Sequence, residues 1–247
     1  MLRVTVLELP ATWGDPGPAL AAVDAELAQG APSDLVLLPE ASLCGYVSPE
    51  GEFDLAPFAE PLDGPTARAL AAMARRHRTN FVGPLVLAEG AHCYNAMVGF
   101  DRHGAPLFTY RKRHPWIPET WASAGLEPAP VVDVEGTRVT IAICYDLHFL
   151  AEDAGPALDA ADLLLFASAW VEENDSRPAR LPELARAHRI AIANANWGAG
   201  VVRVAGQGGS SILDAQGRVV GSGRARSGRV MRLDADIERH SKEELSV

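Results

Sequence analysis

Short apolar runs alternate with polar, glycine-rich and proline-rich segments along most of the chain. Apolar or β-branched runs of about four to eight residues between such segments are typical of strands. The pattern predicts strands at residues 2–9, 34–38, 80–87, 93–100, 106–110, 130–134, 138–143, 162–167, 190–195, 201–204, 209–213, 218–221 and 229–233.

Segments rich in alanine and leucine, with a proline or glycine near one end, are typical of helices. Such segments predict helices at residues 18–29, 65–78 and 179–188. Turn sequences containing glycine predict β-hairpins at residues 101–104, 135–136 and 214–217. Hairpins mixed with helical connections favour an α/β or α+β fold, and 247 residues with 48% hydrophobic content can bury a sizeable core. We therefore expect one domain over residues 1–247.

The charge balance is acidic, because 22 Lys and Arg against 32 Asp and Glu give a formal net charge of −10. No basic block is longer than four residues, so binding to nucleic acid or to an anionic membrane has no electrostatic support. No apolar run approaches the roughly 20 residues of a membrane-spanning helix, and residues 1–6 enter a strand directly instead of forming a signal peptide. These features predict a cytoplasmic protein.

The three cysteines, Cys44, Cys93 and Cys144, are odd in number and lack Cys-x-x-Cys spacing. Their spacing indicates neither a disulfide framework nor a zinc site. Cys93 is interpreted as an ordinary strand residue and Cys44 as a packing residue. No metal and no cofactor are expected.

Glu40, Lys112 and Cys144 each follow an apolar run at the end of a predicted strand. Alone, a cysteine in such a place is usually a small buried residue, and a glutamate or lysine is usually solvated. Together, a thiol nucleophile, a carboxylate base and a cation that stabilises an oxyanion can perform acyl transfer. Active-site residues gather on loops at strand ends in α/β proteins, so these three residues are candidates for one catalytic site.

Four pieces of the chain resemble the nitrilase superfamily of carbon-nitrogen hydrolases in residue type, order and spacing. They are Leu38-Pro39-Glu40 with Gly45-Tyr46, Tyr110-Arg111-Lys112-Arg113-His114, Ile143-Cys144-Tyr145-Asp146, and Gly209-Ser210-Ser211-Ile212-Leu213-Asp214 with Gly217. The resemblance runs from the first strand to about residue 220. It implies a four-layer α-β-β-α sandwich with two mixed sheets, a fold that the strand and helix pattern alone does not specify.

The resemblance also implies a role for each reactive residue. Glu40 would be the general base that deprotonates the thiol and later activates water, Lys112 would stabilise the tetrahedral intermediate, and Cys144 would form a thioester. Glu119 matches the second glutamate of the family and would hold the lysine and the substrate in position, with the neighbouring Glu127 as an alternative. A thiol beside a lysine is expected to have a lowered pKa.

Aromatic residues near these segments are candidates for the substrate pocket. The candidates are Tyr46, Trp116, Tyr145, His148 and Trp170. The backbone N–H of Tyr145 is also a candidate donor to the oxyanion. A large aromatic residue can instead pin a loop to the body of the protein, and this alternative stays open, notably for Trp116 and Trp121 in the proline-rich residues 111–130.

Two segments depart from the pattern of the family. His148 stands where members that take carboxylate-bearing substrates can have an arginine. A guanidinium binds two carboxylate oxygens at once and an imidazole does not, so a neutral or weakly basic substrate is favoured over an anionic one. The second departure follows Arg186-Ala187, where the Glu-Asn pair of the family is missing, and it leaves the local geometry there open.

Cys144-Tyr145-Asp146 resembles the amidase and carbamoylase branches more than true nitrilases. The resemblance implies a cysteine-dependent amidohydrolase that cleaves a small carboxamide and releases ammonia. The alternatives are an N-carbamoyl amidohydrolase, a Cys-His-Asp triad that uses His114, His148 or His188, and a catalytically silent binding or regulatory protein. A homodimer or larger homo-oligomer is expected, with residues 241–247 as a helix end or a contact with a second subunit.

Overall fold

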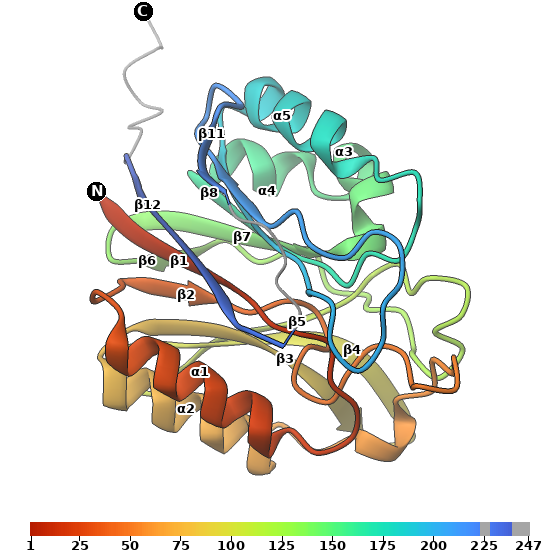
Figure 1. The fold of residues 1–247 in the computed structure, drawn as a ribbon. Helices are drawn as coiled ribbons and strands as arrows, with labels where there is room; N and C mark the ends of the chain where they lie inside the picture. The colour runs from red at the N-terminus through yellow and green to blue at the C-terminus, as the bar shows by residue number, and fades with distance from the viewer. Residues whose placement is uncertain (223–227, 239–247) are drawn as a thin grey trace, which may run out of the picture.

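The computed structural model describes residues 1–222 and 228–238 and contains two six-stranded sheets that pack face to face (Figure 1). The first sheet has the order β12 (Met231–Ile237), β1 (Leu2–Glu8), β2 (Leu35–Leu37), β3 (Asn80–Glu89), β4 (His92–Phe100) and β5 (Pro106–Arg111). The second sheet has the order β11 (Val219–Ser222), β10 (Ser211–Leu213), β9 (Ala191–Ala195), β8 (Leu163–Ala167), β7 (Thr137–Ile143) and β6 (Val132–Val134). Strands β1 to β3 and β7 to β9 are parallel and the other neighbours are antiparallel, so both sheets are mixed.

The main core lies between the two sheets. Val4, Leu37 and Val82 of the first sheet belong to the same apolar cluster as Ile141 and Leu165 of the second. Every residue of β8 is buried, which is why this strand is a continuous apolar run and not an alternating one. Burial on both faces fixes the central parallel strands, and their ends are therefore rigid places for functional side chains.

Helices cover the outer faces of both sheets, which gives four layers (Figure 1). The first sheet is covered by α1 (Gly17–Gln29) and α2 (Pro65–His77), and the second by α3 (Leu150–Asp153), α4 (Gly155–Ala160) and α5 (Arg177–His188). The apolar face of α2 is fully buried at Leu70 and Ala74. The α-β-β-α sandwich expected from the resemblance is confirmed.

The predicted strands and helices are confirmed apart from one strand. Residues 201–204 form a loop, in which Gln207 Nε2 donates to Val202 O at 3.3 Å and Gln207 Oε1 accepts from Val204 N at 3.1 Å. The predicted strand there is wrong, because a glutamine side chain takes the backbone groups that a ladder would use. The tail at residues 241–247 lies outside the described residues.

Four short helical segments were not predicted from the sequence. Two are α3 and α4, and two are the 3₁₀ helices η1 (Ala56–Phe58) and η2 (Cys144–His148). All are too short to show a helical period of apolar residues. Within the described residues, no helix combines the length and the apolar character needed to cross a membrane.

Candidate active site

Three strands deliver the three reactive residues predicted from the sequence. Glu40 follows the end of β2, Lys112 comes directly after β5, and Cys144 comes directly after β7. The backbone N–H of Lys112 still donates to Asn95 O at 2.8 Å, so the β4–β5 pairing fixes the backbone of the lysine. Sheet pairing thus fixes the backbone of Lys112, and Glu40 and Cys144 lie just beyond strand ends.

Lys112 lies between two carboxylates. Its Nζ is 2.7 Å from Glu40 Oε1 and 2.6 Å from Glu119 Oε1, and all three side chains are 0% exposed. Buried charges are stable when they are paired and hydrogen-bonded, as they are here. The structure brings Glu119, and not the exposed Glu127, to the lysine.

Three further donors fix the two carboxylates. Asn95 Nδ2 donates to Glu40 Oε1 at 2.7 Å and to Glu119 Oε2 at 3.3 Å. Tyr46 Oη donates to Glu119 Oε1 at 2.6 Å, and the backbone N–H of Ala169 donates to Glu40 Oε2 at 2.8 Å. Asn95 and Ala169 were not predicted from the sequence. Asn95 had a signal, since it is a polar residue two positions before the buried Met97 and therefore on the same face of β4.

We expect Asn95→Leu to lower kcat by about 10- to 100-fold, because a hydrogen bond to a charged group contributes about 1.5–3 kcal/mol. Steady-state ammonia release measures the effect. Cys93→Ser, two residues earlier on the same strand and partly exposed, is the matched control and should keep full turnover. Equal turnover in the two variants would exclude a role for the amide bridge between the carboxylates.

Cys144 lies at a sharp turn between β7 and η2. Its φ is +46°, a left-handed conformation that is uncommon for a residue with a side chain and occurs at functional sites. Asp146 closes this turn, since its carboxylate accepts from Ile143 N at 3.0 Å, Tyr110 Oη at 2.9 Å and His114 N at 2.9 Å. The aspartate therefore joins the cysteine turn to β5 and to the segment after Lys112.

Burial dominates the electrostatics of the site. It raises the pKa of the Cys144 thiol well above its ordinary value, and the charge of Glu40 raises it further although Lys112 opposes this. The expectation of a lowered thiol pKa is therefore wrong, because desolvation outweighs the lysine. Burial lowers the pKa of Lys112, but Glu40 and Glu119 outweigh burial and leave this pKa above its ordinary value. Both shifts favour the protonated forms, a thiol and an ammonium group.

A narrow recess opens beside Cys144. It is lined by Tyr46, Trp116, Cys144, Tyr145, Ala169, Trp170, Val171 and Glu172. Four of the five predicted pocket residues therefore line it, and the ring of the fifth, His148, lies 4.9 Å from that of Tyr145 and 5.9 Å from that of Trp170. The recess has a volume of about 20 Å³, roughly the room that one water needs. The space beside the thiol is therefore small.

An arginine does lie beside position 148, but it comes from α5. Arg180 Nη1 is 2.6 Å from His148 Nδ1. A guanidinium only donates hydrogen bonds, so Nδ1 accepts and the imidazole is neutral with its proton on Nε2. Burial and the nearby guanidinium lower the pKa of His148. The sequence could not show that the start of α5 lies beside η2. The interpretation that position 148 lacks a nearby cation was therefore incomplete.

The histidines considered for a Cys-His-Asp triad form bonds elsewhere. His114 Nε2 contacts Asp153, His148 contacts Arg180, and His188 Nδ1 lies 2.7 Å from an oxygen of Asp159. The charges that act on Cys144 are instead those of the lysine and the two glutamates. Among residues 1–222 and 228–238, no group of His, Cys, Asp and Glu is arranged to hold a metal ion.

Comparison with protein families decides the relationship. The model of the carbon-nitrogen hydrolase family matches residues 4–240. The chain belongs to this family. The resemblance to the nitrilase superfamily is thereby confirmed.

The omega-amidase YafV of Escherichia coli is 25% identical over 246 residues, which are 96% of this chain and 90% of that protein. A hydrolase in the pqqF 5′ region of Pseudomonas protegens is 34% identical over 140 residues, 56% of this chain, and a formamidase of Allorhizobium ampelinum is 34% identical over 122 residues, 47% of this chain. The chain covers 48% and 34% of the lengths of these last two proteins, about half or less.

An amidase of the nitrilase superfamily from Nesterenkonia AN1, solved as a mutant, superposes with a TM-score of 0.79 and 26% identity over 95% of this chain and 90% of that one. Another mutant of this amidase has a TM-score of 0.80 and 25% identity over 95% and 89% of the two chains. It shows covalent addition of the acetamide moiety of fluoroacetamide at the active-site cysteine.

Proposed function

We propose that the protein is a cysteine-dependent amidohydrolase that cleaves a small carboxamide through a thioester and releases ammonia. The observation that carries this proposal is the buried cluster in which Lys112 bonds Glu40 and Glu119 beside the Cys144 thiol. A nucleophile, a base and an oxyanion-stabilising cation in one dry site suit acyl transfer. The amidases among the relatives support the choice of an amide substrate.

Acylation follows from the protonation states of the free enzyme. Glu40 takes the proton of the thiol while Sγ of Cys144 bonds to the amide carbon and the carbonyl electron pair moves onto oxygen. Lys112 Nζ and the backbone N–H of Tyr145 stabilise the oxyanion. As the intermediate collapses, the C–N bond breaks and the proton held by Glu40 passes to nitrogen. Ammonia leaves and a thioester remains.

Hydrolysis of the thioester uses the same groups in the same order. Glu40 takes a proton from a water whose oxygen bonds to the acyl carbon, and Lys112 again stabilises the oxyanion. The C–S bond then breaks and sulfur recovers a proton from Glu40. Glu119 accepts from the lysine and Tyr46 donates to Glu119, which keeps Nζ in place during both steps.

The charges beside the recess favour a neutral substrate. Glu172 lines the recess, and a carboxylate near a second carboxylate is repelled. Arg180 is the opposing charge, but its guanidinium is bonded to His148, and Arg180 is not among the residues that line the recess. The small volume of the recess also disfavours the N-carbamoyl amino acids that the rival N-carbamoyl amidohydrolase would take.

We expect small neutral amides to have a kcat/KM at least about tenfold above that of ω-amides of dicarboxylic acids and N-carbamoyl amino acids, a difference of about 1.4 kcal/mol. Ammonia release from matched substrates at pH 7.5 measures it. Glu172→Gln should reduce the difference in kcat/KM between neutral and anionic substrates, because it removes the carboxylate that repels the anionic ones.

Arg180→Gln is the matched control for that experiment, and should leave the turnover of neutral amides within about twofold of the unmodified value. If the unmodified enzyme prefers the anionic substrates and Arg180→Gln abolishes this preference, Arg180 on α5 binds the substrate carboxylate. The proposal of a neutral substrate would then be wrong. No ammonia from any amide, urea or nitrile would overturn the proposed function itself.

A further inference from the structure

Arg177 occupies an unusual place for a buried arginine. It is the first residue of α5, where a cation faces the positive end of the helix dipole, and it is only 2% exposed. A guanidinium this deeply buried requires partners for its donors. Two bonds go to Asp175, from Nε to Oδ1 at 2.9 Å and from Nη2 to Oδ2 at 2.8 Å.

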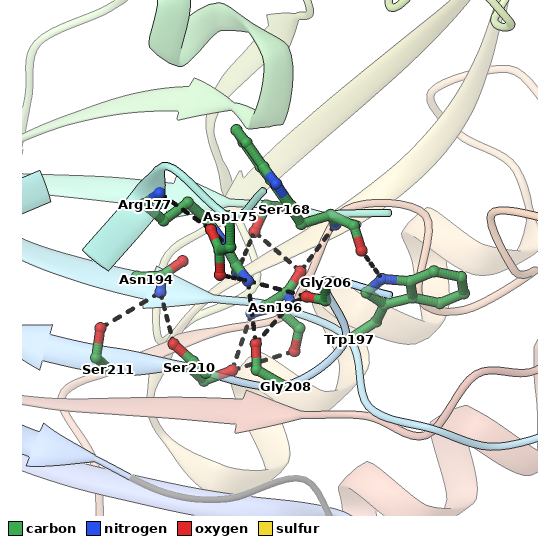
Figure 2. Close-up of polar contacts among 12 residues, drawn as sticks. Ser168, Asp175, Arg177, Asn194, Asn196, Trp197, Gly206, Gly208, Ser210 and Ser211 are labelled. Carbon is green, nitrogen blue, oxygen red and sulfur yellow. Dashed lines mark hydrogen bonds and ion pairs between the residues drawn. The ribbon is translucent and has the colours of Figure 1, made fainter. Parts of the chain in front are cut away.

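The guanidinium of Arg177 also donates to Ser168 and to two glycines (Figure 2). Nη2 donates to Gly206 O at 2.9 Å and to Gly208 O at 3.2 Å, and Nη1 donates to Ser168 Oγ at 3.3 Å. Asn196 Nδ2 donates to the same two glycine carbonyls at 2.8 and 2.7 Å. The arginine and the asparagine therefore hold one loop between them.

Asn196 also bonds the segment that follows β8. Its Oδ1 accepts from Trp170 N at 3.0 Å and from Ser168 Oγ at 3.1 Å. Trp170 O accepts from Trp197 Nε1 at 2.9 Å. Both the N–H and the C=O of Trp170 are thus held by side chains.

The held segment contains two groups of the active site. The N–H of Ala169 donates to Glu40 Oε2 at 2.8 Å, and Trp170 lines the recess beside Cys144. The Cζ of Arg177 also lies 5.4 Å from the centre of the Trp170 ring, within reach of a cation–π interaction. Movement of the arginine would displace the donor to the base and one wall of the recess together.

We propose that Arg177 is a positioning residue, which acts through Ser168, Asn196 and Trp170 to fix the Ala169 N–H on Glu40 and thereby sets turnover without contacting the substrate. The inference rests on the proposed function of the site. A misplacement of about 1 Å by a remote change costs about 100-fold in rate, so the effect is measurable.

Arg177→Met and Arg177→Lys are compared with Arg186→Ala, an exposed arginine on the same helix. Arg177→Met should lower kcat by about 100-fold and change KM by less than about fivefold, because the displaced donor acts on the base. Arg177→Lys should recover part of kcat, since an ammonium keeps the charge but lacks the planar fork. The Arg186→Ala control should match the unmodified enzyme.

Chemical rescue separates positioning from folding. Methylguanidinium at low millimolar concentration should raise the kcat of Arg177→Ala by at least about tenfold, whereas equal urea or sodium chloride should not. A kcat per folded molecule that equals the unmodified value in Arg177→Met, with the folded fraction taken from circular dichroism, would overturn the proposal. Absence of rescue in a folded Arg177→Ala would also overturn it.

Ser168→Ala keeps the proposal testable if the arginine variants fail to fold, because it removes one hydroxyl from the same network. Its kcat should fall by about five- to tenfold at an unchanged melting temperature, and an unchanged kcat would contradict the proposal. The alkylation rate of Cys144 by iodoacetamide gives a second readout that needs no turnover. If no amide is hydrolysed, the proposed function fails, and slower alkylation in Ser168→Ala would still support the positioning role.

Discussion

Cys144→Ser should lower kcat by at least about 10³-fold and leave the fold unchanged. A serine hydroxyl is a weaker nucleophile than a thiol, and Glu40 is placed to deprotonate a thiol whose pKa is already raised by burial. The side chains are nearly isosteric, so the buried turn between β7 and η2 keeps its shape. Ammonia release and circular dichroism measure the two effects.

The order in which the cysteines react tests the same residue. Iodoacetamide should alkylate Cys144 ahead of Cys44 and Cys93 in peptide mapping, because the cluster of Glu40 and Lys112 activates only the first. Burial raises the pKa of both Cys144 and Cys44, that of Cys44 to about 12, but Cys44 lacks the Glu40–Lys112 cluster and therefore has almost no thiolate at neutral pH.

Glu40→Gln sharpens this test. The variant loses the base that takes the thiol proton, and this loss should outweigh removal of the Glu40 charge that raises the thiol pKa, so Cys144 should react more slowly with iodoacetamide. A rate unchanged by Glu40→Gln would mean that the thiolate exists without the base. Full turnover in Cys144→Ser, or equal labelling of all three cysteines, would contradict the thioester mechanism.

The sequence predicted the reactive residues because each follows an apolar run at the end of a strand, where apolar character stops abruptly. Glu40, Lys112 and Cys144 all follow such runs, and parallel strand ends meet at one place in the fold. The resemblance then supplied Glu119 and the four-layer arrangement. The sequence did not show how deeply these groups are buried, so the predicted lowering of the Cys144 pKa was wrong.

Contacts between distant segments account for what the sequence did not show. The N–H of Ala169 reaches Glu40 across 129 positions, and Arg180 reaches His148 across 32. A backbone donor has no residue signature, and an arginine on a helix is ordinary until the helix is placed. The strand predicted at residues 201–204 was wrong for a related reason. Its β-branched residues favour a strand, but Gln207 bonds their backbone groups locally.

Lys112→Met should lower kcat by about 10²- to 10³-fold, as expected for the loss of one oxyanion donor. It should also destabilise the fold by about 3–5 kcal/mol, because two buried carboxylates lose their shared counter-charge. Steady-state kinetics and urea unfolding measure these losses separately.

The destabilisation should depend on pH in a defined direction. Burial already raises the pKa of Glu119, and removal of the lysine, which lowers it, raises it further. A group whose folded pKa is raised stabilises the fold at pH values below its unfolded pKa and loses this contribution as the pH rises through the folded value. Lys112→Met should therefore be most stable at mildly acidic pH and weaken as the pH increases.

The double variant Lys112→Met with Glu119→Gln separates the two roles of the lysine. It removes one of the facing charges, so the free energy of unfolding should recover by more than about 1 kcal/mol and much of the pH dependence should disappear. Turnover should stay as low as in Lys112→Met, because the cation that stabilises the oxyanion is still absent. Recovery of kcat together with stability would show that Lys112 serves to neutralise Glu119, and the oxyanion would then depend on backbone donors such as the N–H of Tyr145.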